Sequence, residues 1–304
     1  MGTGEFTIGI CATGESMEIA QLVTSLLDEA DELQTRLQRL VIVASECPAG
    51  TLSCLRELQE EDSRIDLLVE GRRQGKAEAI NKILALTKSP LVLFVNSDAR
   101  PQPGALKRLL YSMDSDHGIG AVAAVPKLDA GTGLMSLLLN LMWSAHNNCS
   151  VTLNHMNVSN HSCDEMVMFR TSAISLLPRE TVNDGAFLAA TARLRGFSIK
   201  VSTEARVWVT TPKRIDDLIM QRRRILFGHA QVWHQVGTPP RTIESLLFLS
   251  PITGARLLVT TLALRPRLLL AVPVALVSEM AATVLSILDT TRSSKAHAIW
   301  RRFK

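Results

Sequence analysis

Short apolar runs alternate with longer amphipathic stretches through the first hundred residues. The runs at 7–11, 40–44, 65–69 and 91–95 are nearly continuous, as strands covered on both faces of a sheet require. Three longer stretches have the periodicity of helices: one at 18–37, one that ends at residue 61 and one at 77–86. This βαβ rhythm predicts an α/β fold with a mostly parallel, doubly wound sheet flanked by helices. In such sheets ligands bind beyond the carboxyl ends of the strands.

The pattern loosens after Asp98. We expect a helix up to 113, a strand at 121–125 and a helix at 134–147. A second, mixed region begins at 165–170 and continues with a helix at 186–194, a strand at 198–202 and a basic helix from about 215. Residues 1–234 then form one large domain, and residues 235–245 a linker.

Beyond the linker the composition becomes apolar. Segments 246–264 and 268–288 carry one charge each, Arg256 and Glu279. A helix of 21 residues is about 31 Å long and matches a hydrocarbon core of roughly 30 Å. We therefore expect residues 246–304 to form a hydrophobic helical tail that attaches to a membrane, either spanning it or lying on it. The alternative is a soluble core or dimer interface.

Charge and cysteine content narrow the possible partners. The basic residues after 288 (Arg292, Lys295, Arg301, Arg302, Lys304) favour a cytoplasmic, anionic membrane face. A net charge of +4 with 4% aromatic residues argues against nucleic-acid binding. The five cysteines form no CxxC pair and no Cys/His spacing, which indicates neither zinc nor a disulfide framework and fits a reducing cytoplasm. The first apolar run is typical of a strand rather than a signal peptide.

The most distinctive strand end is the fourth, which runs into Asn96, Ser97 and Asp98 and then a proline-fixed turn. A carboxylate at a rigid strand end suits a hard divalent cation that bridges two phosphates. The alternative is that Asp98 only caps the next helix.

The other strand ends are polar as well, and together the segments CATGES, VASECPAGT, GRRQGKAEAIN and VNSDARPQPGAL resemble the family 2 glycosyltransferases from Thr7 to about Ala230. The resemblance implies a GT-A catalytic domain over 1–234, with a nucleotide-sugar half at about 7–100 and an acceptor half at 101–234. It implies that Glu15, Ser45 and Glu46 flank the base and ribose, and that Ala12, Asn96 and Ser97 also bind the substrate. It further implies that the cations Arg72, Arg73 and Lys76 are placed for the diphosphate and that Asp98 holds Mg²⁺ or Mn²⁺. By itself, Lys76 would be interpreted as an exposed residue of a first helical turn.

Two later segments extend the resemblance. Asp184 matches the aspartate that acts as catalytic base in the family, and Gln221, Arg222 and Arg224 match its cationic clamp for the leaving diphosphate. His229 is a further candidate for a metal or diphosphate contact. The alternatives are a helix cap for Asp184, a solvated basic helix face for the clamp and a structural role for His229.

Three departures refine the prediction. Asn96 replaces an acidic residue, Ser45 and Glu46 replace a commoner Asp pair, and Ile225 replaces the Trp of processive members. We therefore expect an inverting, metal-dependent enzyme that moves a single sugar from a UDP- or GDP-sugar to a lipid-linked acceptor. The alternative is a catalytically silent GT-A module that binds nucleotide or a membrane partner. A sugar-1-phosphate nucleotidyltransferase would need a glycine-rich, cation-bearing loop after the first strand, and a dehydrogenase a G-x-G-x-x-G segment; the sequence has neither.

Overall fold

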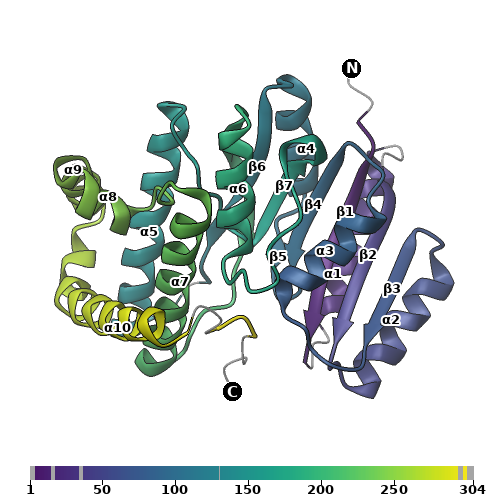
Figure 1. Ribbon diagram of the computed structural model, residues 1–304, viewed down its shortest axis with the longest axis horizontal. Helices are drawn as coiled ribbons and strands as arrows, with labels where there is room; N and C mark the ends of the chain where they lie inside the picture. The colour runs from purple at the N-terminus through teal and green to yellow at the C-terminus, as the bar shows by residue number, and fades with distance from the viewer. Residues whose placement is uncertain (1–3, 15–17, 34–36, 130, 294–296, 300–304) are drawn as a thin grey trace.

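The computed structural model describes residues 4–14, 18–33, 37–129, 131–293 and 297–299. Its centre is an eight-stranded sheet with the order β3-β2-β1-β4-β7-β6-β8-β5 (Figure 1). The strands are β1 (Phe6–Thr13), β2 (Leu37–Ser45), β3 (Ile65–Glu70), β4 (Leu91–Asn96), β5 (Arg100–Pro101), β6 (Ile119–Lys127), β7 (Met166–Arg170) and β8 (Ser198–Trp208). The pairs β1–β2, β2–β3, β1–β4 and β6–β8 are parallel, whereas β7 is antiparallel to both its neighbours and β5 is antiparallel to β8. The predicted α/β sheet is confirmed.

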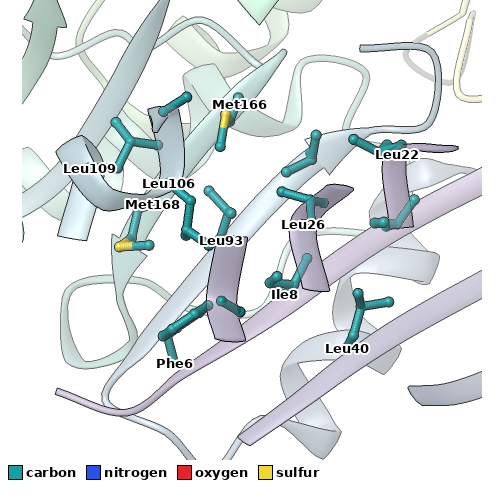
Figure 2. Close-up of a cluster of buried hydrophobic side chains, with 14 of the residues drawn as sticks. Phe6, Ile8, Leu22, Leu26, Leu40, Leu93, Leu106, Leu109, Met166 and Met168 are labelled. Carbon is teal, nitrogen blue, oxygen red and sulfur yellow. The ribbon is translucent and has the colours of Figure 1, made fainter. Parts of the chain in front are cut away.

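Helices cover both faces of this sheet. Alternate residues of β4 enter two different cores: Leu93 packs with α1 (Glu18–Glu32) and α4 (Ala105–Ser115), while Val92 packs with α3 (Lys76–Leu86) and α6 (Asp184–Leu194). Figure 2 shows the first core, where Leu22 and Leu26 of α1 and Leu106 of α4 meet β1 and β4. Burial on both faces is the physical reason that these strands read as unbroken apolar runs. The helix α2 (Ala49–Glu61) adds Leu55 to the same core.

A second group of helices lies at the end of the molecule farthest from β3 (Figure 1). It contains α5 (Gly133–His155), α7 (Ile215–Val236), α8 (Ile243–Leu249), α9 (Pro251–Leu264), the 3₁₀ helix η2 (Pro266–Ala271) and α10 (Val272–Arg292). Leu138 of α5, Leu218 of α7 and Leu268 of η2 share one small core. The tail therefore packs directly on helices of the preceding domain.

The two apolar segments of the tail differ in length as helices. Pro251 begins a new helix, so the first segment divides into α8 and α9, and both are too short to cross a bilayer. The second runs as one helical stretch over Pro266–Arg292, which is long and apolar enough to cross a membrane by length and composition alone. A single such helix is weak evidence for a span.

Candidate active site

A cleft of about 610 Å³ opens where β1 and β4 end at the carboxyl edge of the sheet. Its wall combines Asn96, Ser97 and Asp98 after β4 with Lys76 at the start of α3 and Asp184 at the start of α6. These residues come from segments far apart in the sequence, so only the folded chain brings them together. This is the place at which α/β sheets bind ligands.

A chain of polar contacts joins the two halves of the cleft. The Lys76 ammonium lies 2.9 Å from the Asp184 carboxylate and donates a hydrogen bond of 3.0 Å to Asn96 Oδ1. Asn96 Nδ2 in turn donates to Glu165 Oε2 at 2.8 Å. Burial alone would lower the pKa of Lys76, but the nearby carboxylates, Asp184 first, outweigh it and raise the pKa above its usual value. Lys76 is therefore a charged residue of the cleft.

The two aspartates do not cap helices. Gly104 in left-handed backbone is the N-cap of α4, and Asp98 lies in the cleft wall before it. Asn183 is the N-cap of α6 and makes no side-chain capping bond, while Asp184 in the first turn is only 6% exposed and pairs with Lys76.

Two acidic residues that the sequence analysis did not single out also line the cleft, Asp164 and Glu165. Burial, and next the Asp184 charge, raise the pKa of Asp164 to about 7. Its Oδ1 atom is buried and has no hydrogen-bond partner among the described residues. Burial likewise raises the pKa of Glu165, although the hydrogen bond from Asn96 opposes this. One carboxyl group of the cleft is thus poised to change its protonation near neutral pH.

The remaining predicted site residues divide into two groups. Ala12, Ser45, Gln221 and Arg224 line the cleft together with the residues above. Arg72, Glu46, Arg222 and His229 do not line it, and Glu15 lies outside the described residues. Of the two neighbouring arginines that we expected at the diphosphate, only Arg73 lines the cleft, and its backbone N–H donates to the exposed Glu46 at 3.3 Å.

Arg222 faces the tail. Its guanidinium donates to Glu279 of α10 at 2.6 Å and also pairs with Glu244 of α8. Asp217, Gln221, Arg224 and Ile225 share one side of α7, at the spacing i, i+4, i+7 and i+8, and all four line the cleft. Arg222 is about 100° around the helix from Gln221, which explains its different surroundings.

The C-terminal segment returns to the cleft. His297 lies 2.7 Å from Asp289 at the end of α10, and Ala298 lines the cleft beside Gly75. Gly75 has a φ of 101° in the turn before α3, and a side chain there would press on the Ala298 carbonyl. The turn that presents Lys76 is therefore shaped for a glycine.

His229 belongs to a buried row of histidines rather than to the cleft. The ring centroids lie 5.9 Å apart for His146 and His161 and 5.2 Å apart for His161 and His229. Burial lowers the pKa of all three, that of His229 to about 4. Within the described parts of the chain, no group of three or more His, Cys, Asp or Glu side chains is arranged to hold a metal ion.

This row predicts acid sensitivity. An unfolded histidine titrates near 6.5, whereas His229 titrates near 4, so its neutral form stabilises the fold above pH 6.5 and this contribution is lost as the pH falls toward 4. Between pH 7 and pH 5, His229 alone is expected to cost about 2 kcal/mol of unfolding free energy. Urea unfolding at both pH values should show a smaller loss for His229→Gln than for the wild type. His117→Gln, which alters an exposed histidine, is the control, and equal losses in all three proteins would contradict the interpretation.

Gly185 leaves room for the Asp164 carboxylate. A Cβ atom at this position would lie 1.8 Å from Asp164 Oδ1. Gly185→Ala is therefore expected to displace Asp164, to cost about 1–3 kcal/mol of stability and to lower any activity of the cleft. Gly50→Ala, in the first turn of α2 with no atom within 4 Å, should leave the melting temperature unchanged or slightly higher. Equal melting temperatures for the two variants would show that the cleft accommodates the methyl group.

Comparison with solved structures shows the same fold. A mannosyltransferase from Pyrobaculum calidifontis, PcManGT, in complex with GDP-Man and Mn²⁺, is 19% identical, with a TM-score of 0.65 over 94% of this chain and 88% of that one. Glucosyl-3-phosphoglycerate synthase from Mycobacterium tuberculosis, with Mn²⁺, UDP-glucose and phosphoglyceric acid, is 17% identical, with a TM-score of 0.50 over 78% and 81%. TarS from S. aureus is 17% identical, with a TM-score of 0.50 over 76% of this chain and 42% of that one. None of the curated proteins matches the chain.

The family comparison is more specific. Residues 4–228 match the family described as "Glycosyltransferase like family 2", which is most of the chain and includes every β-strand and the part of α7 that lines the cleft. The predicted resemblance is thereby confirmed. The chain belongs to glycosyltransferase-like family 2, is a glycosyltransferase and has the GT-A fold.

Proposed function

We propose that the protein transfers one sugar, with inversion, from a UDP- or GDP-sugar to a lipid-linked acceptor at the cytoplasmic face of a membrane. The observation that carries the proposal is the pairing of Asp184 with Lys76 in a cleft that Asp98 also lines. Such a displacement needs two carboxylates. One takes the proton of the acceptor, and the other, at the end of a strand, holds the metal ion for the donor diphosphate.

The oxygen donors of the cleft suit Mg²⁺ or Mn²⁺. Asp98 and Glu165 provide carboxylates near Asn96, and these hard ligands are the type that both ions prefer. Two carboxylates are fewer than a closed protein cage needs, but Mg²⁺ is usually held by one or two carboxylates together with phosphate oxygens and water. Asp98 would hold the ion, with Glu165 beside it. When bound, the ion neutralises the charge that develops on the leaving diphosphate.

Asp184 is the proposed general base. Its carboxylate takes the proton of the acceptor hydroxyl while that oxygen attacks the anomeric carbon. The bond from that carbon to the diphosphate breaks on the opposite side, so the configuration inverts and the nucleoside diphosphate leaves. Lys76 orients the Asp184 carboxylate, because the two charged groups are only 2.9 Å apart. Where the acceptor is a lipid phosphate, its oxygen attacks directly.

Cationic and amide groups of the cleft serve the leaving group. Arg224 and Gln221 come from α7, and Arg73, Lys213 and Arg214 line the same cleft. Arg224 also donates to the Val182 carbonyl at 3.0 Å, which ties it to the loop before Asp184. The clamp that we propose thus contains Gln221, Arg224 and Arg73, but neither Arg72 nor Arg222. Because Ile225 occupies the place of the family's Trp, we propose a single transfer rather than a processive polymerase.

The acceptor class follows from the tail. Long apolar side chains of α8 to α10 are exposed to solvent, among them Phe248 at 89% and Val277 at 68%. A catalytic domain with such an attachment acts on substrates that are present at a membrane, so we propose a polyprenyl phosphate or a glycolipid as acceptor.

The test is release of nucleoside diphosphate from a panel of UDP- and GDP-sugars with polyprenyl phosphate or glycolipid, with and without Mn²⁺. The proposal expects release that needs one donor, one lipid and the metal together. Nucleotide binding without release under any combination would favour the silent module instead, for which the neutral Asn96 is the specific argument, since an amide ligates metal less strongly than a carboxylate.

A further inference from the structure

The stretch η2–α10 has its polar and apolar sides reversed relative to a helix of a soluble protein. Its solvent side carries large apolar residues, each between 42% and 68% exposed: Leu276, Val277, Met280, Val284, Ile287 and Leu288. These positions recur every three or four residues and so form one stripe along the helix. The side packed on the protein carries small or polar residues: Ser278, Glu279, Ala282, Ser286 and Asp289.

This reversal is not explained by packing within the molecule. A surface helix normally turns its apolar stripe toward the core and its polar side toward water. Soluble monomers rarely expose a continuous apolar patch of this kind, and such patches mark contacts with proteins or membranes. Leu269 and Leu270 of η2 extend the exposed apolar surface at the beginning of the stripe. An apolar environment must therefore cover this side of α10.

The polar side of α10 is fixed to α7 at two points. Glu279 pairs with Arg222, and Asp289 pairs with Arg223. The arginines are neighbours on α7, whereas their partners lie about 15 Å apart along α10 at 1.5 Å per residue. The two helices therefore cross at a steep angle, as Figure 1 shows. Because α10 is held at both points, its stripe has one fixed direction.

The charges around the stripe have a single sign. Arg256, Arg265, Arg267 and Arg292 are exposed on the tail helices or at their ends. The acidic residues of α8 to α10, Glu244, Glu279 and Asp289, all pair with arginines of α7. A basic rim around an apolar stripe is the pattern of helices that lie in the headgroup region of an anionic bilayer. A second copy of this chain would bring two basic rims together.

We infer that α10, with η2, is a monotopic membrane anchor that lies in the plane of an anionic bilayer and does not cross it. A crossing helix would expose Glu279 and Asp289 to hydrocarbon, where ionisable groups are costly, and would leave Arg222 and Arg223 without these partners. Helix α7 cannot enter the bilayer with α10, since its other side lines the cleft. The inference specifies the membrane attachment under the proposed function, but it does not depend on glycosyl transfer.

This placement brings the bilayer close to the cleft. One side of α7 holds α10, and another carries Gln221 and Arg224 in the cleft wall. The anchor and the cleft are thus separated by about the diameter of one helix, roughly 10 Å. A lipid-linked phosphate or sugar in the headgroup region can reach the cleft while its lipid chains stay in the bilayer.

The experiment is flotation of the full-length protein with sealed vesicles of phosphatidylcholine alone or with 30% phosphatidylserine, without nucleotide sugar. We expect binding to the anionic vesicles, weaker binding to the neutral ones and a decrease at high salt. The variant Val277→Ser/Met280→Ser/Val284→Ser/Ile287→Ser should lose at least about tenfold in binding. The matched control, Tyr111→Ser/Leu176→Ser/Leu194→Ser, removes equally exposed apolar side chains elsewhere and should bind like the wild type.

A C-terminal epitope tag distinguishes the two membrane orientations. In a monotopic protein bound from outside, external protease removes the tag completely, whereas a tag carried across the bilayer is protected. Protection of the tag would overturn the in-plane placement. Failure to bind any vesicle, or equal loss in both variants, would overturn the anchor, and a dimer in solution that dissociates only in the quadruple variant would assign the stripe to a second copy. A protein that binds vesicles as expected but releases no nucleoside diphosphate would refute the proposed function and leave the anchor intact.

Discussion

Asp184→Asn is expected to lower the turnover of the glycosyltransferase by about a thousandfold while leaving donor affinity little changed. The amide keeps the size of the carboxylate but cannot accept the acceptor's proton, and positioned general bases contribute about 10² to 10⁴ in rate. Release of nucleoside diphosphate gives the turnover number, and calorimetric titration of the donor with Mn²⁺ gives the affinity. Asp129→Asn, at an exposed aspartate paired with Arg100, is the matched control and should have wild-type turnover.

A variant of the neighbouring Asp164 distinguishes between two candidates for the base. Its pKa of about 7 and its closeness to Asp184 make it the alternative base of the same cleft. If Asp164→Asn abolished turnover while Asp184→Asn kept it, the base would be Asp164 and the assignment from the family motif would be wrong. If Asp184 is the base, Asp164→Asn should act through the charge balance with Lys76 and shift the pH profile of turnover rather than remove it.

The fold was predictable because its strands are buried on both faces. Every position of the apolar runs 40–44 in β2 and 91–95 in β4 packs into one of the two cores, so these runs have no polar interruption that could be confused with a helix. The family resemblance in four strand-end segments was confirmed for the same reason, since each segment follows a strand whose position is fixed. The exact ends of the helices were less predictable: α5 runs to His155 rather than 147, because no proline or glycine ends it earlier.

Asp164 and Glu165 could not be found by searching the ends of strands in the order of the chain. They precede β7, and β7 is antiparallel to β4, so its beginning lies at the edge where β1 and β4 end. Strand direction depends on which strands pair, and a local pattern does not contain that information. The signal that was present is a pair of acidic residues directly before a buried apolar run.

The sequence alone predicts only part of the arrangement of the residues on α7. Helical periodicity places Arg222 on a different side of the helix from Gln221 and Arg224. A clamp made of all three residues is therefore geometrically unfavourable. The partners of Arg222 could not be predicted from the sequence, because Glu279 lies 57 residues away along the chain. The high hydropathy of the tail likewise could not show that Glu279 and Asp289 face the protein and the leucines face outward. The roles assigned to the individual site residues stay predictions.

Asp98→Asn is expected to remove the stabilisation that a donor nucleotide sugar gives in the presence of Mn²⁺, and to lower turnover at least about a hundredfold. Selective binding to the native state at 100 times the Kd adds about 2.7 kcal/mol, which raises the melting temperature of a protein of this size by roughly 5 °C. The substitution would remove the carboxylate that we propose as a ligand of the ion, and the diphosphate would then lose the positive charge that the ion supplies. The measurement is a thermal-shift panel of UDP- and GDP-sugars with Mn²⁺, with Mg²⁺ and with chelator.

The comparison between the two aspartate variants decides what the cleft does. Asp184→Asn should keep the full metal-dependent rise in melting temperature, because it affects the proton and not the diphosphate, whereas Asp98→Asn should lose it. Glu165→Gln tests whether the second carboxylate also binds the ion. A partial loss of the metal-dependent rise in melting temperature would assign Glu165 to the ion, whereas an unchanged rise would leave Asp98 as the carboxylate that binds it. An equal rise with and without Mn²⁺ in the wild type would mean that Lys76 and Arg224 alone neutralise the diphosphate. Asn96 would then mark a glycosyltransferase that works without a divalent ion.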